Sequence, residues 1–191
     1  MDKLKLVKEI GRGKERACFV HPQDRTKIIK VVHASTCKQM KRELSVYDQI
    51  ADKPNINYKH MPMLHTQVDT DKGTGYVFDL VENSDGTSAK SLHWFLQHGS
   101  RLKDFYPQLK ALKAYFLQHA IVFCRDMSFD GNILVKEEAN GLKTLVVVDG
   151  LGDVTFIQWP NRFDCFARKK IERRWDWLMG RLEQFDAEHA A

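Results

Sequence analysis

Residues 124–135, CRDMSFDGNILV, place two aspartates, an asparagine and a glycine directly before an apolar run. Asp126 and Asn132 carry carboxylate and amide oxygens, and Asp149 ends the later apolar run LVVV. Such hard oxygen atoms suit Mg²⁺, although Asp, Asn and Gly are also ordinary turn residues. The pattern predicts either a loop that handles phosphate and magnesium or a polar turn. Asp149 favours the first interpretation most strongly, because an aspartate at the end of a buried strand is a frequent site position.

A second set of candidates lies in the first quarter of the chain. Gly11 and Gly13 form a turn between two predicted strands, Lys30 lies in the short apolar run KIIKVV, and Glu43 lies in a predicted helix. Each has a plain explanation alone, as a hairpin turn, an edge lysine and a surface glutamate. Their order along the chain, ahead of the polar loops, indicates a common site.

The elements that must position these residues follow from the spacing of apolar side chains. Residues 4–32 alternate apolar and charged residues around a two-glycine turn, which predicts three strands. Residues 64–70 and 75–82 predict two more, joined by the turn DKGTG. Residues 36–52 change to helical spacing. The predicted apolar face of this helix is Met40, Leu44, Tyr47 and Ala51, and its predicted capping box is Thr36 with Gln39.

The second half of the chain is mainly helical. A short helix is predicted from Leu92, a longer one over 102–119, and a hairpin of 132–135 and 144–149 around Asn140-Gly141. A final helix is predicted from the spacing of Ile171, Trp175, Leu178, Leu182 and Phe185. The change of character near residue 84 marks the expected boundary between two lobes.

Composition limits the classes of protein that the chain can represent. With 191 residues, 43% hydrophobic and 29% charged, it is long enough for one domain or one domain of two lobes. No apolar run has the length of a membrane helix, and the N-terminus lacks the apolar core of a signal peptide. The four cysteines form no C-x-x-C pair, which favours reduced thiols in the cytoplasm. The net charge of +5 mildly favours anionic partners such as nucleotides, nucleic acid or a membrane surface, without choosing among them. We expect a nucleotide partner and no membrane partner.

Taken together, the order of these features resembles the protein-kinase-like fold. The stretches ACFVHPQDRTKIIKVV, KRELSVYDQI and GTGYVFDL resemble the PhoP regulatory network protein YrbL family, a group of small bacterial kinase-like proteins. The resemblance implies an α+β, two-lobed fold with a shortened, mainly helical C-terminal lobe. It predicts a single domain, 1–191, made of an N-lobe of five strands and one helix, 1–83, and a reduced C-lobe, 84–191.

The resemblance also implies a site for ATP and Mg²⁺. Lys30, held by Glu43, would reach the phosphates, while backbone groups at Asp79 and Val81 would meet the adenine edge. The implied roles are cofactor binding for Gly11, Gly13, Lys30, Glu43, Asp79, Val81 and Leu134, metal ligation for Asn132 and Asp149, and the general base for Asp126.

Five departures from the kinase pattern qualify these roles. Arg16 stands where the third loop glycine is expected, and Cys124 stands in place of the catalytic-loop histidine. Asn132 follows Asp126 by six positions instead of five, which makes Asp130 a rival for the metal or base role. The D-F-G position reads DGL, without the phenylalanine, and only 42 residues follow its aspartate, too few for the usual peptide-binding platform.

Three functions remain open from the sequence. The first is an ATP- and Mg²⁺-dependent phosphotransferase, whose acceptor is a small molecule, the protein itself or one specific protein. The second is a catalytically weak or inactive pseudokinase that binds nucleotide or a protein and acts in regulation. The third is nucleic-acid binding through the basic run 167–177, which we rank last because such a run is more often the solvated face of a helix.

Overall fold

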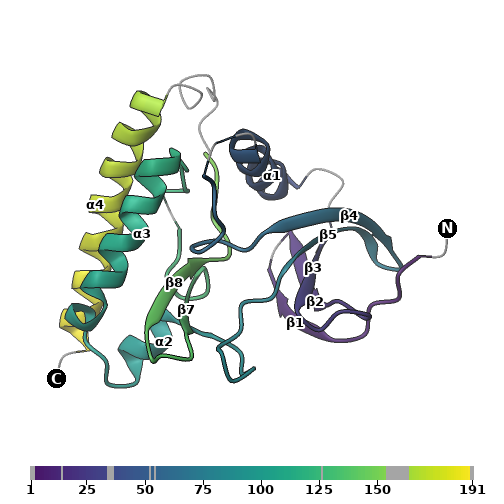
Figure 1. Ribbon diagram of the computed structural model, residues 1–191, viewed down its shortest axis with the longest axis horizontal. Coiled ribbons are helices and arrows are strands. Elements are labelled where there is room, and N and C mark those ends of the chain that lie inside the picture. The colour runs from purple at the N-terminus through teal and green to yellow at the C-terminus, as the bar shows by residue number, and fades with distance from the viewer. Residues whose placement is uncertain are drawn as a thin grey trace. The chain divides into compact units, whose positions relative to one another are not determined.

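The computed structural model describes residues 3–13, 15–33, 37–51, 53, 55–125, 127–153 and 164–189. The chain divides into two compact units, one formed by Met1–Lys41 and Pro62–Val81, the other by Arg42–Met61 and Glu82–Ala191. The first unit holds β1 Glu9–Arg12, β2 Arg16–Val20, β3 Lys27–Val32, β4 Leu64–Thr70 and β5 Gly73–Asp79 (Figure 1). Helix α1, Lys38–Ala51, begins in the first unit and continues in the second.

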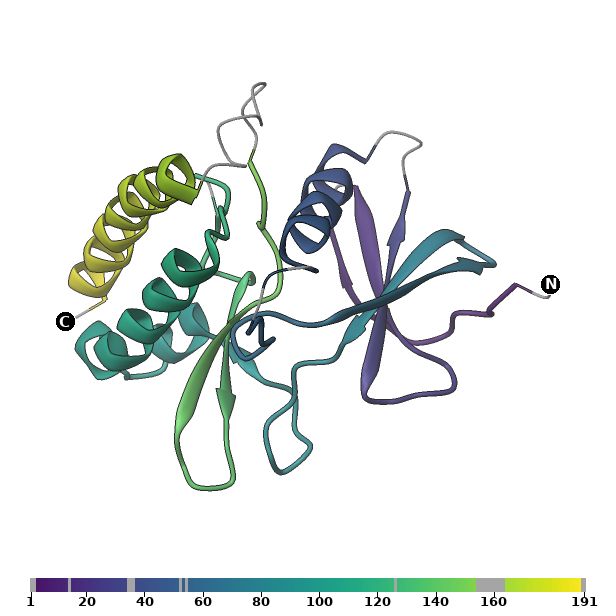
Figure 2. The ribbon, with the colours of Figure 1, turned by 45° about the horizontal axis from the view of Figure 1, so that its top comes forward.

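The second unit contains most of the helices. Its elements beyond α1 are β6 Lys90–Ser91, α2 Leu92–Gln97, the 3₁₀ helix η1 Leu102–Phe105, α3 Tyr106–His119, β7 Ile133–Glu137, β8 Lys143–Val147 and α4 Asp164–Glu188. Helices α3 and α4 run side by side, and α3 covers β8 (Figures 1 and 2). None of the helices formed by the described residues has both the length and the apolar character needed to cross a bilayer.

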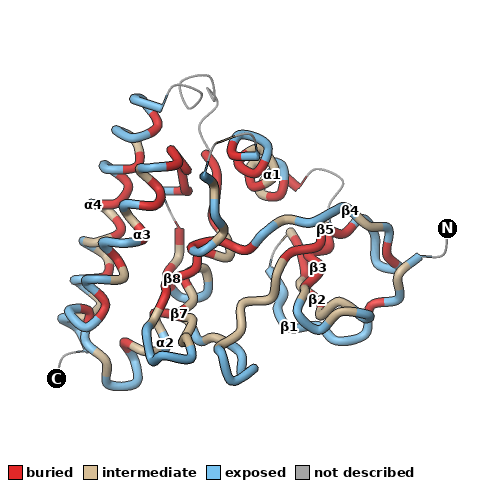
Figure 3. Tube along the Cα trace, viewed as in Figure 1, coloured by how far each residue is buried: buried red, intermediate tan, exposed pale blue. Residues whose placement is uncertain are grey.

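The first unit is one antiparallel sheet in the order β1-β2-β3-β5-β4. β1 is exposed along its whole length, whereas β3 is buried in its middle (Figure 3). The segment before β1 lies along the opposite edge, since Leu4 pairs with Thr70 of β4 and its carbonyl accepts from the Asp71 N–H at 2.9 Å. One stretch of chain thus contributes to both edges of the sheet. The core of the sheet consists of Leu6, Ala17, Phe19, Ile29, Val31 and Val77.

The buried face of α1 differs from the one predicted. Met40 and Tyr47 are buried as expected, but Ala51 is exposed and Leu44 is only half-buried, so the prediction was wrong for these two positions. The buried side chains of α1 instead follow one another at intervals of three or four positions along one face of the helix, and one of them is a glutamate. This buried stripe of α1 consists of Met40, Glu43, Val46, Tyr47 and Ile50. Thr36 of the predicted capping box lies outside the described residues.

The helix predicted over 102–119 forms as two elements. The first turn is the 3₁₀ helix η1, and α3 then begins at Tyr106 with Pro107 in its first turn. Proline is favoured there because the first helical N–H groups have no partner within the helix. The predicted apolar positions of this segment are confirmed as buried: Leu102, Phe105, Leu109, Leu112 and Phe116.

Helix α4 also follows its predicted periodicity. Ile171, Trp175, Leu178 and Leu182 are buried, and Phe185 is half-buried. The basic run on this helix, however, is not purely a solvated face. Arg168, Lys169 and Arg173 are exposed, whereas Arg174 is buried among the apolar residues. The expected solvated face therefore does not include Arg174.

Candidate active site

The hairpin of β7 and β8 brings Asn132 and Asp149 together. The ladder pairs Ile133 with Val147, and beyond it the Val148 N–H donates to the Asn132 carbonyl at 2.9 Å. Val148 is therefore the cross-strand neighbour of Asn132, and Asp149 directly follows Val148. The Asn132 side-chain nitrogen lies 3.4 Å from the place where a Cβ on Gly150 would be. The two predicted metal ligands are thus neighbours at one end of the hairpin.

Two glycines shape the loop that follows Asp149. Gly150 and Gly152 have φ values of +84° and +92°, a region that is costly for residues with a Cβ. A Cβ on Gly152 would also lie 2.8 Å from the backbone oxygen of Arg42 in α1. Both the backbone conformation and the close approach of α1 therefore require glycine at position 152.

The same loop is hydrogen-bonded to the segment that leads into the predicted catalytic loop. The Cys124 N–H donates to the Gly150 carbonyl at 2.7 Å, and the Gly152 N–H donates to the Val122 carbonyl at 2.8 Å. Phe123 and Leu151 form a bridge between these bonds. The segment that ends just before Asp126 is thus fixed beside the loop that begins at Asp149. Asp126 itself lies outside the described residues.

The extra residue between Asp126 and Asn132 is accompanied by a buried aromatic anchor. Phe129 is buried and its ring lies 5.4 Å from the ring of Phe185 in α4 and 5.7 Å from that of His93. The Arg181 guanidinium lies 5.4 Å from the Phe129 ring and donates to the Met127 carbonyl at 3.3 Å. The longer loop is therefore held from α4, by contacts that the sequence spacing did not indicate.

Asp130, the rival for the metal or base role, is placed differently from Asp149. Its side chain is 72% exposed and pairs with His93 Nδ1 at 2.9 Å. Asp149, in contrast, is half-buried and is followed by a loop with two glycines of left-handed φ, Gly150 and Gly152. This makes Asp130 the weaker candidate for metal binding.

In the first unit, the glycine turn is held by one backbone bond, from the Gly13 N–H to the Arg16 carbonyl at 2.8 Å. Neither Gly11 nor Gly13 has a left-handed φ. A Cβ on Gly11 would meet nothing within 4 Å, and one on Gly13 would meet only the Arg16 oxygen, at 3.7 Å. The fold of this unit therefore does not require glycine at either position. Arg16, which stands where the third loop glycine is expected, is buried.

Lys30 and Glu43 are both buried, which is unusual for charged residues. Lys30, 3% exposed, holds its ammonium 4.2 Å from the centre of the Phe78 ring on β5. Glu43, 1% exposed, lies on the part of α1 that belongs to the second unit. The ion pair that the family resemblance implies between them stays a prediction.

The remaining predicted residues lie on strand ends and in β7. The Asp79 N–H donates to the Met63 carbonyl at 3.1 Å, and its carboxylate accepts from His65 at 2.6 Å. A ligand could use this N–H only by displacing the first bond. Val81, the last residue of the first unit, is half-buried. Leu134 is half-buried on the face of β7 opposite that of its fully buried neighbours.

Asp153 is the main residue that the sequence analysis missed. Its carboxylate is 1% exposed and binds Arg174 Nη2 at 2.5 Å and the ammonium of Lys170, both on α4. The available signal was the repeated spacing in DGLGD, together with two basic residues four positions apart beside the apolar stripe of α4. We had assigned these basic residues to a solvated face, and for Arg174 that was wrong.

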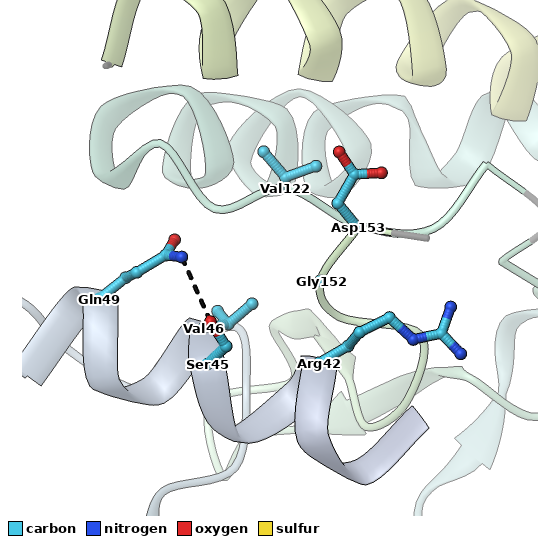
Figure 4. A pocket seen from close by; sticks show the side chains of 7 residues that line it. All are labelled: Arg42, Ser45, Val46, Gln49, Val122, Gly152 and Asp153. Atoms are coloured by element: carbon cyan, nitrogen blue, oxygen red, sulfur yellow. Dashed lines mark hydrogen bonds between the residues drawn. The ribbon is translucent and has the colours of Figure 1, made fainter. Parts of the chain in front are cut away.

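A pocket lies on the α1 side of the same loop (Figure 4). It is lined by Arg42, Ser45, Val46, Gln49, Val122, Gly152 and Asp153. Neither Asn132 nor Asp149 contributes to it, so we do not assign this pocket to phosphate chemistry.

The donor set at Asn132 and Asp149 fits a shared cation and not a metal held by protein alone. Across the described ranges, no group of three or more His, Cys, Asp or Glu side chains could hold a metal ion. One amide oxygen and one carboxylate suit Mg²⁺, which commonly takes one or two protein ligands together with phosphate oxygens and water. The residues therefore fit Mg²⁺ bound with a nucleotide.

Comparison with solved structures identifies the fold. The kinase domain of Mycobacterium tuberculosis PknI, in two mutant forms, matches with a TM-score of 0.50 at 12% and 11% sequence identity. The matches cover 76% of this chain and 58% or 59% of those domains, so this chain spans less than two thirds of their length. The likeness confirms the predicted α+β, two-lobed protein-kinase-like fold with a shortened, mainly helical C-terminal lobe.

Comparison of sequences identifies the family. The chain is 30% identical over 182 residues to the YrbL proteins of Escherichia coli (strain K12) and Shigella flexneri, which covers 92% of this chain and 85% of each relative. The family model described as PhoP regulatory network protein YrbL matches residues 3–183. This chain is therefore a member of the PhoP regulatory network protein YrbL family.

Proposed function

We propose that this chain binds ATP with Mg²⁺ and transfers the γ-phosphoryl group to a hydroxyl acceptor. The observation that carries the proposal is the position of Asn132 and Asp149 at one end of the β7–β8 hairpin, beside the segment that leads to Asp126. The kinase-like fold supports it, because this fold is typically used for ATP and Mg²⁺. The acceptor is a small molecule, the protein itself or one specific protein partner.

Each predicted residue has a role in this proposal. Gly11 and Gly13 let backbone N–H groups approach phosphate oxygens, and Lys30 adds a positive charge that Glu43 orients. Asn132 and Asp149 hold Mg²⁺, which when bound neutralises negative charge on the phosphates. Backbone groups at Asp79 and Val81 contact the adenine edge, and Leu134 packs against its ring.

The transfer step requires a base near the acceptor. The hydroxyl oxygen forms a bond to the γ-phosphorus, the bond from that phosphorus to the bridging oxygen breaks, and ADP leaves. Asp126 accepts the hydroxyl proton. In the segment just before Asp126, Cys124 takes the place of the usual histidine, and its thiol donates to the Gly152 carbonyl at 3.4 Å. This bond is one more link between the two loops.

The direct test is calorimetric titration with ATP, with and without Mg²⁺, of the wild type, Asp149→Ala and a control, Asp48→Ala. Asp48 is exposed on α1 and lies outside the proposed site. We expect Mg²⁺ to tighten ATP binding in the wild type and the control, and to have no such effect in Asp149→Ala. Mg²⁺ without nucleotide should bind weakly to all three, because the protein supplies only two ligands. Equal ATP binding in all three proteins would refute the site.

A regulatory pseudokinase is the second candidate. The six-residue spacing between Asp126 and Asn132 and the anchored Phe129 favour it, since misplacement of about 1 Å can cost a hundredfold in rate. ATP hydrolysis, with water as a substitute acceptor, separates the two functions. Phosphotransfer predicts slow Mg²⁺-dependent hydrolysis that Asp126→Asn abolishes while ATP binding is kept. The pseudokinase predicts binding without hydrolysis in both proteins.

A further inference from the structure

We propose that Arg174 is a positioning residue for the loop Asp149–Asp153, acting through Asp153 and the carbonyl of Phe123. The proposal rests on the proposed function, because it takes Asp149 as a metal ligand. It deepens that function by assigning to α4 a part in the geometry of the metal site, beyond its packing against α3.

The guanidinium of Arg174 joins two segments of the chain. Its Nη2 donates to Asp153 Oδ1 at 2.5 Å, and its Nη1 donates to the Phe123 carbonyl. Arg174 is only 5% exposed, so these bonds are shielded from water. A planar guanidinium has donors in a fixed fork and can therefore hold both acceptors in one orientation. Lysine, with its single flexible ammonium, cannot reproduce that geometry.

Each oxygen of the Asp153 carboxylate binds a different cation of α4. Lys170 binds Oδ2 while Arg174 binds Oδ1, and the two cations lie one helical turn apart. In Figure 4 the Asp153 side chain points away from α1. Asp153 lines the pocket on the α1 side, whereas Lys170 and Arg174 do not. The end of the loop is thus anchored to α4 by charged side chains.

The loop between the anchor and Asp149 contains the residues with the greatest backbone freedom. Gly150 and Gly152 both adopt left-handed φ and flank Leu151. Glycine loses more conformational freedom on folding than any other residue. A fixed Asp153, together with the backbone bonds to Val122 and Cys124, therefore limits the positions available to Asp149.

A buried ion pair alone is weak reason to infer a role in stability. Removing two charges from water is costly, and apolar replacements of such pairs are often neutral or stabilising. If the cluster only packed α4, it would cost more free energy of desolvation than apolar side chains would. The apolar stripe of α4 already buries Ile171, Trp175 and Leu178. Orientation of the loop explains why charges lie here, since residues that hydrogen-bond to metal ligands fix the direction of those ligands.

The test compares Arg174→Met with Arg173→Met, a change of the same type at the exposed neighbouring position of α4. For each variant, ATP affinity is titrated against Mg²⁺ concentration. We expect Arg174→Met to weaken the apparent Mg²⁺ affinity by about 10- to 100-fold. Arg173→Met should leave it unchanged, and ATP binding without Mg²⁺ should change in neither.

Because Arg174→Met leaves a buried carboxylate with one partner fewer, it can also reduce stability. The double variant Asp153→Asn/Arg174→Met removes this charge and should recover most of the free energy of unfolding. Positioning predicts that the double variant still has the weakened Mg²⁺ affinity. A double variant with both wild-type stability and wild-type Mg²⁺ affinity would show that the cluster only packs α4, and would overturn the proposal.

Hydrogen exchange of the backbone separates this proposal from the function on which it rests. The amides of Cys124 and Gly152, which bond the two segments, should exchange faster in Arg174→Met and in the double variant than in Arg173→Met. If the wild type shows no Mg²⁺-dependent ATP binding, the proposed function fails, and the exchange result alone decides whether Arg174 fixes the loop. Unchanged exchange at both amides would refute the positioning role.

Discussion

In the first unit, Gly11 and Gly13 have no atom closer than 3.7 Å to the place where a Cβ would lie, whereas in the second unit Gly150 and Gly152 have left-handed φ and close neighbours. The first pair lies on or next to β1, a strand that is exposed at every residue. The second pair lies in a buried loop with hydrogen bonds to the segment 122–124. The same residue type thus has a different reason to be present in each unit.

This difference separates two kinds of requirement. The fold itself explains the glycines after Asp149, so changes there act first on stability. The fold does not explain the glycines of the β1–β2 turn, so changes there should act on a ligand and leave stability nearly intact. In the proposed function, the residues of the second unit are preorganised by the fold, whereas the glycines of the first unit are explained by the ligand that they are proposed to bind.

The largest effect is expected from Gly152→Ala. Left-handed φ costs about 1–2 kcal/mol for a residue with a Cβ, and the 2.8 Å approach to the Arg42 oxygen adds a steric cost of similar size. We expect a loss of about 3 kcal/mol in the free energy of unfolding, measured by urea denaturation.

The control for this change is Gly86→Ala, where φ is +78° but no atom lies within 4 Å of the new Cβ. It should cost only the backbone term, about 1–2 kcal/mol. If both variants lost the same free energy, the close contact between Gly152 and α1 would be irrelevant to stability.

The next largest effect is expected on ATP affinity, from a change at Gly11 in the first unit. In the protein without nucleotide, the side chain added by Gly11→Val would meet open space, and valine favours strands. The free energy of unfolding should change by less than about 0.5 kcal/mol, while ATP affinity should fall about tenfold, which corresponds to about 1.4 kcal/mol. Denaturation and calorimetry on the same preparation measure both. Wild-type ATP affinity in this variant would remove Gly11 from the site.

The second unit should also respond to mild acid through His60. Burial lowers the pKa of His60, although its hydrogen bond to the Leu145 carbonyl opposes the shift. The folded state then resists a proton that the unfolded state accepts below about pH 6.5, so stability falls as the pH drops through and below that value. We expect the free energy of unfolding to be lower at pH 5.5 than at pH 7.

His60→Asn, whose amide can still donate to Leu145, should reduce this loss. His189→Asn, at the exposed end of α4, is the control. Denaturation curves at several pH values measure the slope, and an unchanged slope in His60→Asn would assign the acid sensitivity to other groups.

The smallest effect is expected at Asp130. Its exposed pair with His93 should contribute less than about 1 kcal/mol to stability. Asp130→Asn should also leave Mg²⁺-dependent ATP binding unchanged, in contrast to Asp149→Ala. A loss of Mg²⁺ dependence in Asp130→Asn would move the metal site from the hairpin end to the longer loop.

Local patterns predicted the hairpin that carries the site. Asn140-Gly141 marked its turn, and there the Leu142 N–H donates to the Asn140 side chain at 3.1 Å while Gly141 has a φ of +75°. Apolar runs on either side marked the strands, and the ends of such a hairpin necessarily meet. The adjacency of Asn132 and Asp149 follows from that geometry, so this part of the site could be predicted.

The contacts from α4 could not be predicted in the same way. Arg174 is 21 residues from Asp153 and stands in a run whose composition is typical of a solvated helix face. Helical spacing places position 174 beside the apolar stripe, but the bond of its side chain to Asp153 depends on tertiary packing. The burial of Glu43 in the stripe of α1 also depends on packing, since the residue alone has the plain explanation of a surface glutamate.

The central claim is that Asn132 and Asp149 hold one Mg²⁺ between them, and a double-mutant cycle tests it most directly. Mg²⁺-dependent ATP affinity would be measured for the wild type, Asn132→Ala, Asp149→Ala and the double variant. If the two residues share one ion, the double variant should be little worse than Asp149→Ala alone, because the ion is already lost. Two independent losses that simply add, or no loss in either single variant, would contradict the claim.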